Sequence, residues 1–427
     1  MRDYAKAYAL GTQLGPLHLV ASVDIGLFAL LSVRSGAFDP AALGLGLALA
    51  LAAYATGVLL VRFRMGDTYI CSIVSMLVGL GLAMQYRLSP ETGLRQFVWF
   101  LAGTAMFLAV NRIYGACHGR LKSLWLSYGG MIGLFLLTLA LGTDLKGARN
   151  WIVIGGFTLQ PSEFIKILFV FFLASYVHDP EQLRLKYPRF RAEPRWVLMG
   201  LVFVLLGLFA LQKEFGTALL VFMIYLSFLY VFGRSLLFPL ANLAAAGLGA
   251  AVAVKTVHHL QVRIDTWLDP WADIAGKGYQ ITQSLFAIGT GSFFGTGLGL
   301  GRPDYIPAVH TDFIFAALCE EMGIFGGMGV ILLFFMLAYR GIKIALRLQN
   351  RYTKAVAFGL TALLGFQTFI IIGGDIKLIP LTGITLPFVS YGGSSLLASY
   401  AVLGLLQALS GPILREEVLA HEDGFRQ

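Results

Sequence analysis

The stretch GTALLVFMIYLSFLYVF, residues 216–232, decides the class of fold. It holds no charged residue, and its length falls in the range of about 17–25 residues that a helix needs to cross the hydrocarbon core of a bilayer. Similar apolar stretches recur along nearly the whole chain of 427 residues, of which 57% are hydrophobic and 13% are charged. A water-soluble domain carries about 25% charged residues. The sequence therefore predicts an all-α integral membrane protein and excludes a soluble fold.

About twelve membrane spans are expected, with no soluble domain of any size between them. The predicted spans are residues 15–33, 41–61, 68–84, 96–110, 124–141, 163–177, 196–212, 216–232, 236–254, 323–339, 355–373 and 394–409. The two spans on either side of Lys213 are close enough to form one broken helix, which would reduce the number to eleven. The first apolar stretch lacks the pattern of a cleavable signal peptide, so we interpret it as a span.

The placement of lysine and arginine predicts the orientation, because cytoplasmic loops carry an excess of both. With the N-terminus in the cytoplasm, most of the 32 lysines and arginines fall in cytoplasmic segments, and both termini lie inside. The long polar segment 255–312 then lies outside. This bias accounts for much of the net charge of +9 without a nucleic-acid partner. We interpret the basic stretch 179–195 as a cytoplasmic loop near anionic lipid.

Charged residues at membrane depth are costly and usually functional. Glu163 and Lys166 stand three residues apart at the start of a predicted span and therefore share a helix face. They could form a mutually neutralised pair near the interface, but the preceding residues 147–162 are also rich in polar side chains, which favours a site. Asp24 lies in the first predicted span and is assigned no role.

The outer segment 255–312 has the highest density of candidate catalytic residues. Asp265, Asp269 and Asp273 lie close together beside two tryptophans, Trp267 and Trp271, which belong at a membrane interface. A positioned aspartate can act as a general base. The alternative is a solvated acidic loop, and the residues alone leave both interpretations open.

Two further outer segments are candidates for binding. The glycine-rich run 289–301 follows no strand and lacks the Gly-x-Gly-x-x-Gly spacing, so we expect an interfacial or re-entrant loop rather than a phosphate-binding loop. Beyond it, Asp312 is expected to open or cap the next helix. The last outer loop, residues 375–395, ends in a run of serines and glycines whose hydroxyls and amides could hold an anionic head group.

Five motifs, in order along the chain, resemble those of the SEDS family (shape, elongation, division and sporulation; RodA, FtsW and SpoVE). They are Gly147-Ala148-Arg149-Asn150-Trp151 followed by Gln160-Pro161-Ser162-Glu163 and Lys166; Gly216-Thr217-Ala218; Asp269-Pro270 with Asp273, Gly276, Gly278-Tyr279-Gln280 and Gln283-Ser284; His310-Thr311-Asp312-Phe313 with Glu320-Glu321 and Gly323; and Pro380, Gly383 and Leu386-Pro387 with Ser390-Tyr391-Gly392-Gly393-Ser394-Ser395. The resemblance runs from about residue 68 to residue 409.

The resemblance implies a peptidoglycan glycosyltransferase. Such enzymes polymerise lipid II, a disaccharide-pentapeptide on undecaprenyl pyrophosphate, at the outer face of the bacterial cytoplasmic membrane during elongation, division or sporulation. They usually work with a class B penicillin-binding protein, which cross-links the product, and with other elongasome or divisome membrane proteins. The family's catalytic aspartate matches Asp273 here, and its glutamate and lysine match Glu163 and Lys166.

The resemblance also divides the chain. The family core has about ten spans, so the first two spans are an added N-terminal hairpin. We therefore predict a cytoplasmic tail and hairpin over 1–67, a core with the catalytic loop 255–312 over 68–409, and a cytoplasmic tail over 410–427. Three departures from the family pattern are Ile274 after the catalytic aspartate, Lys213-Glu214-Phe215 in place of a frequent Pro-Asp-Leu, and Ala308 in place of a glutamate.

The mechanism that the resemblance implies needs a base and cations. Asp273 would take the proton of a sugar 4-hydroxyl as it attacks the anomeric carbon of a second lipid-linked sugar. Cations would stabilise the pyrophosphate leaving group, with Arg149, Lys166, Arg263 and Lys377 as candidates in that order, and a divalent ion such as Mg²⁺ or Mn²⁺ could assist. The expected substrate-binding residues are Arg149, Trp151, Gln160, Ser162, Glu163, Lys166, Arg263, Gln280, His310, Lys377, Ser390, Ser394 and Ser395.

A flippase and a scaffold are the alternative functions, and a metal site is the alternative kind of site. A lipid II flippase would place its charges near the bilayer midplane, often within inverted repeats, whereas here the polar residues gather in outer loops. A scaffold for cell-wall synthases would not require Asp273. No protein-only metal site is predicted, because Cys71, Cys117 and Cys319 show no metal spacing and are interpreted as lone buried thiols.

Overall fold

The computed structural model describes residues 2–34, 38–117, 120–145, 148–155, 157–184, 193–233 and 235–424, with side chains between residues 14 and 411 apart from short stretches. The chain divides into two compact units. Unit 1 comprises Met1–Gly115, Gln283–Arg347 and Thr385–Gln427, and unit 2 comprises Ala116–Thr282 and Leu348–Ile384. Within the described ranges, eleven helices are long and apolar enough to cross a membrane, which confirms the prediction of an all-α, multi-pass membrane protein.

The remaining predicted span, residues 163–177, is also a helix. It is α6 (Ser162–His178), which has 17 residues and lies at the short end of the lengths that cross a bilayer. The stretch around Lys213 forms two helices rather than one, α7 (Pro194–Leu211) and α8 (Phe215–Phe232). Lys213 itself has a φ of 60°, in the left-handed region that ends a helix.

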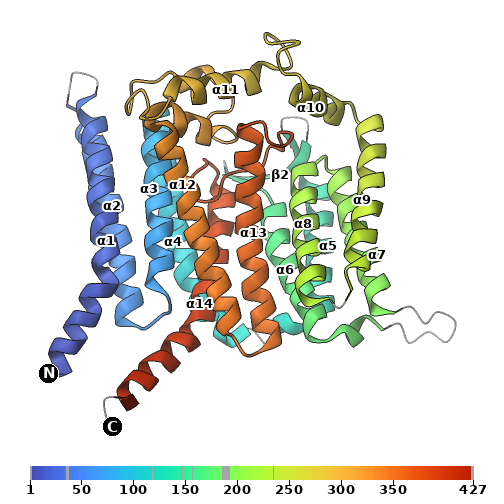
Figure 1. Cartoon of the computed structure of the whole chain (residues 1–427), viewed down its shortest axis with the longest axis horizontal. Helices are drawn as coiled ribbons and strands as arrows, with labels where there is room; N and C mark the ends of the chain where they lie inside the picture. Colours follow the sequence, from blue (N-terminus) through green and yellow to red (C-terminus); the bar gives the residue numbers. More distant parts are fainter. Residues whose placement is uncertain are drawn as a thin grey trace. The chain divides into compact units, whose positions relative to one another are not determined.

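Unit 1 is built from long helices around a buried apolar core. Its elements are α1 (Arg2–Val33), α2 (Pro40–Arg62), α3 (Thr68–Leu88), α4 (Pro90–Cys117), most of α11 (Tyr279–Gly291), a 3-10 turn at Pro303–Tyr305, α12 (Ile314–Arg347) and α14 (Gly393–Gly424). The predicted N-terminal hairpin is the antiparallel pair α1 and α2 (Figure 1). It packs closely, because a Cβ on Gly46 or Gly57 would overlap Phe28 or Leu17 of α1.

The span predicted to begin at residue 323 has a break in the structure at that residue. Helix α12 starts earlier, at Ile314, but the backbone of Gly323 is not helical (φ 71°), so α12 consists of two helical segments that meet at a kink there. The glycine-rich run completes the hydrogen bonding at this kink. Thr296 N and Gly297 N donate to the carbonyls of Glu320 and Glu321 (2.9 and 3.0 Å), while Ile324 N and Phe325 N donate to the carbonyls of Ser292 and Phe293 (2.9 and 3.3 Å). These reciprocal bonds replace those that the helix loses at its kink, so the glycine-rich run is held in place at this point.

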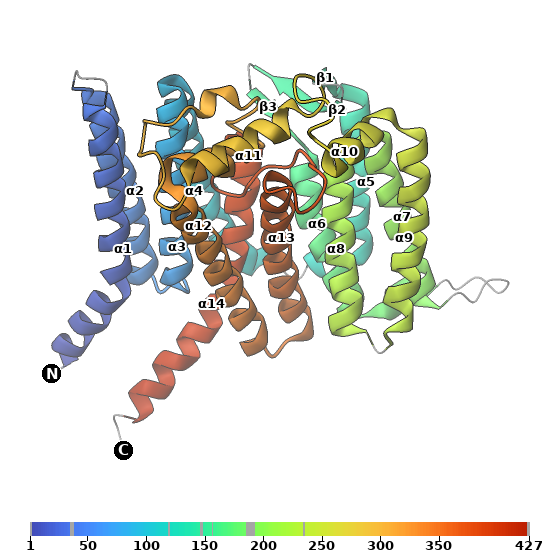
Figure 2. The same ribbon diagram turned by 45° about the horizontal axis from the view of Figure 1, so that its top comes forward.

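Unit 2 holds the remaining helices and a small sheet that was not predicted. Its elements are a 3-10 turn at Arg120–Lys122, α5 (Leu124–Leu141), β1 (Thr143–Leu145), β2 (Ala148–Ile154), β3 (Phe157–Leu159), α6, a 3-10 turn at Pro180–Leu183, α7, α8, α9 (Leu237–Thr256), α10 (His258–Leu268) and α13 (Arg351–Asp375). The three strands are antiparallel in the order β1-β2-β3 and join the end of α5 to the start of α6 (Figure 2). The sheet was missed because its strands are short and two of them have only three residues.

Candidate active site

Asp273 lies in an exposed turn between α10 and α11, in unit 2. The turn is closed by its own backbone: Gly276 N and Gly278 N donate to the carbonyl of Asp273 (3.2 and 3.0 Å). One carboxylate oxygen, Oδ2, accepts a hydrogen bond from Lys277 N (3.0 Å). Among the described residues the other oxygen, Oδ1, has no hydrogen-bond partner, so this exposed carboxylate keeps the capacity to accept a proton or a hydrogen bond from a substrate.

Two glycines shape this turn. A Cβ on Gly276 would lie 2.4–2.7 Å from the carboxylate atoms of Asp273, and a Cβ on Gly278 would lie 2.2 Å from the carbonyl oxygen of Pro270. A side chain at position 276 would therefore force the carboxylate to move, whereas one at position 278 would force the backbone to move. The Gly276-x-Gly278 motif thus has a local physical reason, since it makes room for Asp273.

Three contacts hold α10 against the loop that follows α13. Arg263 Nη1 donates to the carbonyl of Thr382 (2.8 Å), Trp267 Nε1 donates to the carbonyl of Lys377 (3.2 Å), and Lys377 Nζ donates to the carbonyl of Leu268 (3.4 Å). The predicted residues Arg263 and Lys377 therefore both lie at the contact between α10 and this loop. Both side chains are half-buried, so each keeps part of its surface open.

Glu163 and Lys166 form the predicted ion pair within α6. Lys166 Nζ lies 2.8 Å from Glu163 Oε2 and 3.0 Å from Gln367 Oε1 of α13, and Lys166 is only 2% exposed. Two of the three ammonium protons of Lys166 are thus used inside unit 2. This geometry favours a role in holding α6 to α13 over direct contact with a leaving group.

Gln160 and Ser162 point to a carboxylate that was noted only as a departure from the family pattern. Glu214 Oε1 accepts hydrogen bonds from Asn150 Nδ2 (2.6 Å), Gln160 Nε2 (3.0 Å) and Ser162 Oγ (3.1 Å). Burial raises the pKa of Glu214, and the hydrogen bonds from Gln160, Asn150 and Ser162 oppose that rise. Glu214 therefore connects β2, the start of α6 and the turn before α8. The side chains of Gln160 and Ser162, which were expected to bind substrate, donate their hydrogen bonds to Glu214 instead.

In unit 1, His310 is held by Gln85 of α3. Gln85 Nε2 donates to the carbonyl of His310 (2.8 Å), which leaves Gln85 Oε1 facing His310 Nδ1 (2.8 Å). With this assignment Nδ1 carries the hydrogen of a neutral ring, and Nε2 is left as an acceptor. Burial lowers the pKa of His310, which favours that neutral form.

The predicted serine-rich loop is tied to the same histidine segment. Tyr391 N donates to the carbonyl of His310 (2.8 Å), and Ser390 Oγ donates to the carbonyl of Thr311 (2.6 Å). Ser395 Oγ pairs with Thr385 Oγ1 (2.6 Å), and Ser394 is buried. Most of these hydroxyls therefore fix the loop, which leaves fewer of them to bind a head group than the sequence suggested.

The remaining predicted residues are less constrained. Trp151 is half-buried in β2, where its carbonyl accepts a hydrogen bond from Thr143 Oγ1 (3.1 Å). Gln280 is exposed in the first turn of α11. Arg149 lies in β2, but its side chain is outside the described residues, as is that of Cys117. The expectation that Asp312 opens the next helix is off by two residues, since Asp312 lies in a turn and α12 begins at Ile314.

Sequence reasoning missed one charged cluster in unit 1. Arg87, at the end of α3, pairs with Glu321 of α12, lies 3.1 Å from Asp304 and donates to the carbonyl of Gly301 (2.6 Å). The second carboxylate oxygen of Glu321 accepts from Gly299 N (2.8 Å). Arg87 therefore fastens the glycine-rich run to α3 and α12. The available signal was a charged residue only three positions beyond the end of the predicted span 68–84.

A divalent ion finds no protein-only site in the part of the chain that the structure describes. No three His, Cys, Asp or Glu side chains among those residues gather closely enough to hold a metal. Mg²⁺ is often held by one or two carboxylates together with substrate phosphates, so the donors present supply at most part of such a site.

Comparisons with known proteins identify the family of this chain. The family model described as "Cell cycle protein", for FtsW, RodA and SpoVE, matches residues 67–412. Peptidoglycan glycosyltransferase RodA of Mycobacterium tuberculosis is 36% identical over 374 residues, which cover 81% of this chain and 78% of the relative. Stage V sporulation protein E of Bacillus subtilis is 35% identical over 363 residues, which cover 81% of this chain and 96% of the relative.

A solved structure is also similar to this chain. A chain from work on the structural coordination of polymerization and crosslinking by a peptidoglycan synthase complex matches with a TM-score of 0.65 and 27% identity, covering 81% of this chain and 97% of that chain. The resemblance inferred from the five motifs is thereby confirmed, and the chain belongs to the FtsW, RodA and SpoVE family of cell cycle proteins.

Proposed function

We propose that this protein is a peptidoglycan glycosyltransferase that polymerises lipid II at the outer face of the bacterial cytoplasmic membrane. Relatives with that activity in their names share about a third of their residues with this chain over most of its length. The single observation that carries the proposal for this chain is Asp273, an exposed carboxylate at the position of the family's catalytic aspartate, with a glycine beside it that leaves it room.

The proposed reaction forms one bond and breaks another. The 4-hydroxyl oxygen of one lipid-linked sugar attacks the anomeric carbon of a second, the bond from that carbon to the pyrophosphate oxygen breaks, and Asp273 takes the hydroxyl proton. General-base catalysis of this kind contributes about 10²- to 10⁴-fold to a rate. Asp273 suits the task because its Oδ1 is open, while the Lys277 amide holds Oδ2 and so orients the carboxylate.

The leaving pyrophosphate needs positive charge. Arg263 and Lys377 are the proposed donors in unit 2, because each is half-buried and each is positioned by a hydrogen bond to a backbone carbonyl. Lys166 is placed behind them in importance, since Glu163 and Gln367 already occupy it. Arg149 keeps its place among the candidates, and His310 is proposed as an acceptor for a substrate hydroxyl in unit 1 through its Nε2.

The proposal also includes the orientation of the chain in the membrane and a protein partner. Both termini are placed in the cytoplasm, which puts Asp273 outside, where lipid-linked sugars are polymerised. A class B penicillin-binding protein is the proposed partner, supported by the likeness to a chain from a synthase complex that coordinates polymerization with crosslinking.

The test is a reconstituted assay that scores polymerisation and flipping separately. Purified protein in liposomes receives fluorescent lipid II, with and without the penicillin-binding protein, and glycan chains are resolved on gels while exposure of lipid II on each leaflet is followed by quenching. We expect glycan chains in the presence of wild-type protein and faster chain formation with the partner. Flipping without polymer would contradict the proposal and favour a transporter, and neither activity would favour a scaffold.

A further inference from the structure

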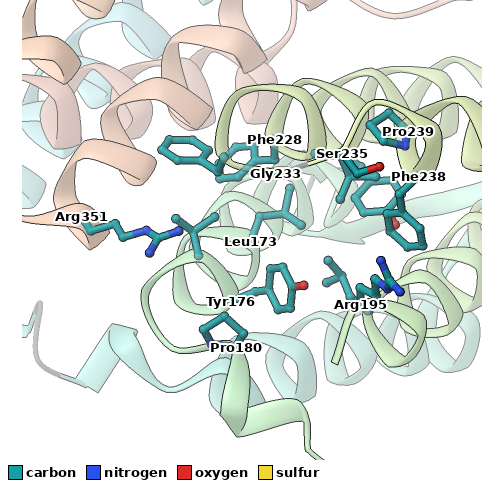
Figure 3. A pocket seen from close by; sticks show the side chains of 15 residues that line it. Leu173, Tyr176, Pro180, Arg195, Phe228, Gly233, Ser235, Phe238, Pro239 and Arg351 are labelled. Carbon is teal, nitrogen blue, oxygen red and sulfur yellow. The ribbon is translucent and has the colours of Figure 1, made fainter. Parts of the chain in front are cut away.

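A cavity of about 340 Å³ lies in unit 2. It is at the helix ends opposite to the Glu214 cluster, which consists of Glu214 and its hydrogen-bond partners Asn150, Gln160 and Ser162. It is lined by the last turns of α6 and α8, the first turns of α7 and α9, and the first residue of α13 (Figure 3). The Glu214 cluster lies at the opposite ends of α6, α7 and α8. The volume falls at the lower end of the range of about 300–1,000 Å³ for ligand pockets, and it is roughly eleven times the 30 Å³ that one water occupies, so a single ion or water would not fill it.

The walls of this cavity are apolar and two arginines stand at its sides. Leu173, Phe228 and Leu229 contribute apolar surface, while Arg351 reaches in from α13 and Arg195 lies on the other side (Figure 3). No nucleotide or other fully polar solute suits such walls. An amphiphile with a negatively charged head and a hydrocarbon chain matches both features.

The two arginines differ in how far their charges are already neutralised. Arg195 lies 2.6 Å from Glu193, but both side chains are about half exposed, so this ion pair is weak. Its guanidinium also lies over the rings of Trp196 and Phe238 (5.7 and 5.8 Å to the centroids), which keeps it at the cavity. In the part of the chain that the structure describes, Arg351 forms no ion pair within 4.0 Å.

Helix α9 borders the cavity and is sparsely packed. Only Asn242 of α9 is buried, and Tyr225 Oη of α8 donates to its Oδ1 (3.1 Å). The cavity reaches from Tyr225 on α8 to Phe238 at the start of α9. A gap beside a loosely held apolar helix forfeits dispersion contacts unless hydrocarbon fills it, and in a membrane the hydrocarbon at hand is a lipid chain.

We propose that this cavity binds an anionic glycerophospholipid, with one acyl chain against Leu173, Phe228 and Leu229 and with Arg195 and Arg351, on opposite sides of the cavity, attracting its negatively charged head group. The lipid would come from the leaflet that meets this end of unit 2, which the lysine and arginine distribution predicts to be the cytoplasmic one. The bound lipid would fill the space among α6, α7, α8 and α9 and tie the start of α9 to the rest of unit 2. This site is independent of the glycosyltransferase proposal, because its readout is lipid binding.

The test measures lipid retained by the whole protein. Protein in mild detergent is exchanged into mixed micelles that hold phosphatidylglycerol or phosphatidylcholine with the same acyl chains, then desalted, and the bound lipid is counted by native mass spectrometry. The variants are R195Q/R351Q, the charge-preserving R195K/R351K, and R112Q as a matched control, because Arg112 is an exposed arginine of α4 that does not line the cavity. Inorganic phosphate is added as a competitor in a further arm.

We expect wild-type protein to retain phosphatidylglycerol roughly tenfold better than phosphatidylcholine, and R195Q/R351Q to lose roughly that factor. R112Q should match wild type, R195K/R351K should keep most of the binding, and phosphate should not displace the lipid. Equal retention of the two lipids, or unchanged retention by R195Q/R351Q, would overturn the site. Displacement by phosphate alone would overturn the assignment to a glycerophospholipid. Should R195Q/R351Q fail to fold, the wild-type comparison and R195K/R351K still decide.

Discussion

Two polar regions of unit 2 make opposite use of their charges. In the turn that follows α10, Asp273 is exposed, and among the described residues its hydrogen bonds come from backbone amides of its own turn, so that one carboxylate oxygen stays open. In the cluster at the start of α6, Glu163, Lys166 and Glu214 are buried and bound to other side chains. The difference indicates that the exposed turn takes part in catalysis, whereas the buried cluster stabilises the fold. Variants in the first should lose activity at constant stability, and variants in the second should lose stability.

The largest effect on stability is expected from Lys166→Met. Methionine fills a similar volume but leaves Glu163 buried without its cation, and removal of one partner of a buried pair costs about 3–5 kcal/mol. Thermal unfolding of the detergent-solubilised protein should show a large fall in Tm. The double variant E163Q/K166M is the matched control, because it removes both charges and should recover much of the loss. Equal Tm values for the single and double variants would mean that the pair does not hold α6.

A smaller, purely catalytic effect is expected from Gly276→Ala. The backbone at Gly276 is not left-handed, so alanine is allowed, but its Cβ would meet the Asp273 carboxylate at 2.4–2.7 Å and turn it away. We expect polymerisation to fall about tenfold, since small misplacements of reacting groups are costly, with no change in Tm. Gly289→Ala is the control, because no atom lies within 4 Å of its added Cβ. Full activity in G276A would show that the position of the carboxylate does not matter.

The smallest effect concerns pH and Glu214. Burial raises the pKa of Glu214 above its ordinary value of 4.5, so the folded chain holds this proton more tightly than the unfolded chain does. Its contribution to stability is therefore complete below pH 4.5 and is lost as the pH rises through the raised pKa. Glu214→Gln keeps an acceptor for Asn150, Gln160 and Ser162 but cannot ionise, so its Tm should vary less as the pH rises above 4.5. The exposed Glu181 supplies the control E181Q, and the same pH slope in E214Q and wild type would contradict the cluster's role.

The sequence predicted the spans and the family better than the contacts. Apolar length alone located all the long helices, because a bilayer imposes one length on each span. The segment of α12 before Gly323 was not included in the predicted span 323–339, and Glu320 and Glu321 lie in it. They are tolerated because the glycine-rich run supplies partners for their backbone and side chains from some twenty residues away in sequence.

The sequence predicted which residues belong to the candidate site, but not which of them bind each other rather than substrate. Gln160 and Ser162 were expected to bind substrate and are instead bound to Glu214. No local pattern could reveal this, because Glu214 lies more than fifty residues further along the chain. Asp273 itself was singled out by the family motif rather than by its neighbours, since Asp265 and Asp269 are of the same type and lie close in sequence.

Asp273 is the proposed general base, and the direct measurement of that role is the rate at which the variant Asp273→Asn polymerises lipid II. Asparagine has the same shape, so we expect unchanged Tm and elution together with a loss of about 10²- to 10⁴-fold in rate. Asp269→Asn is measured beside it and should stay near the wild-type rate, because asparagine can still accept the hydrogen bond from Trp271 N that Asp269 Oδ1 accepts now (3.1 Å). A folded D273N protein that polymerises lipid II at the wild-type rate would contradict the claim.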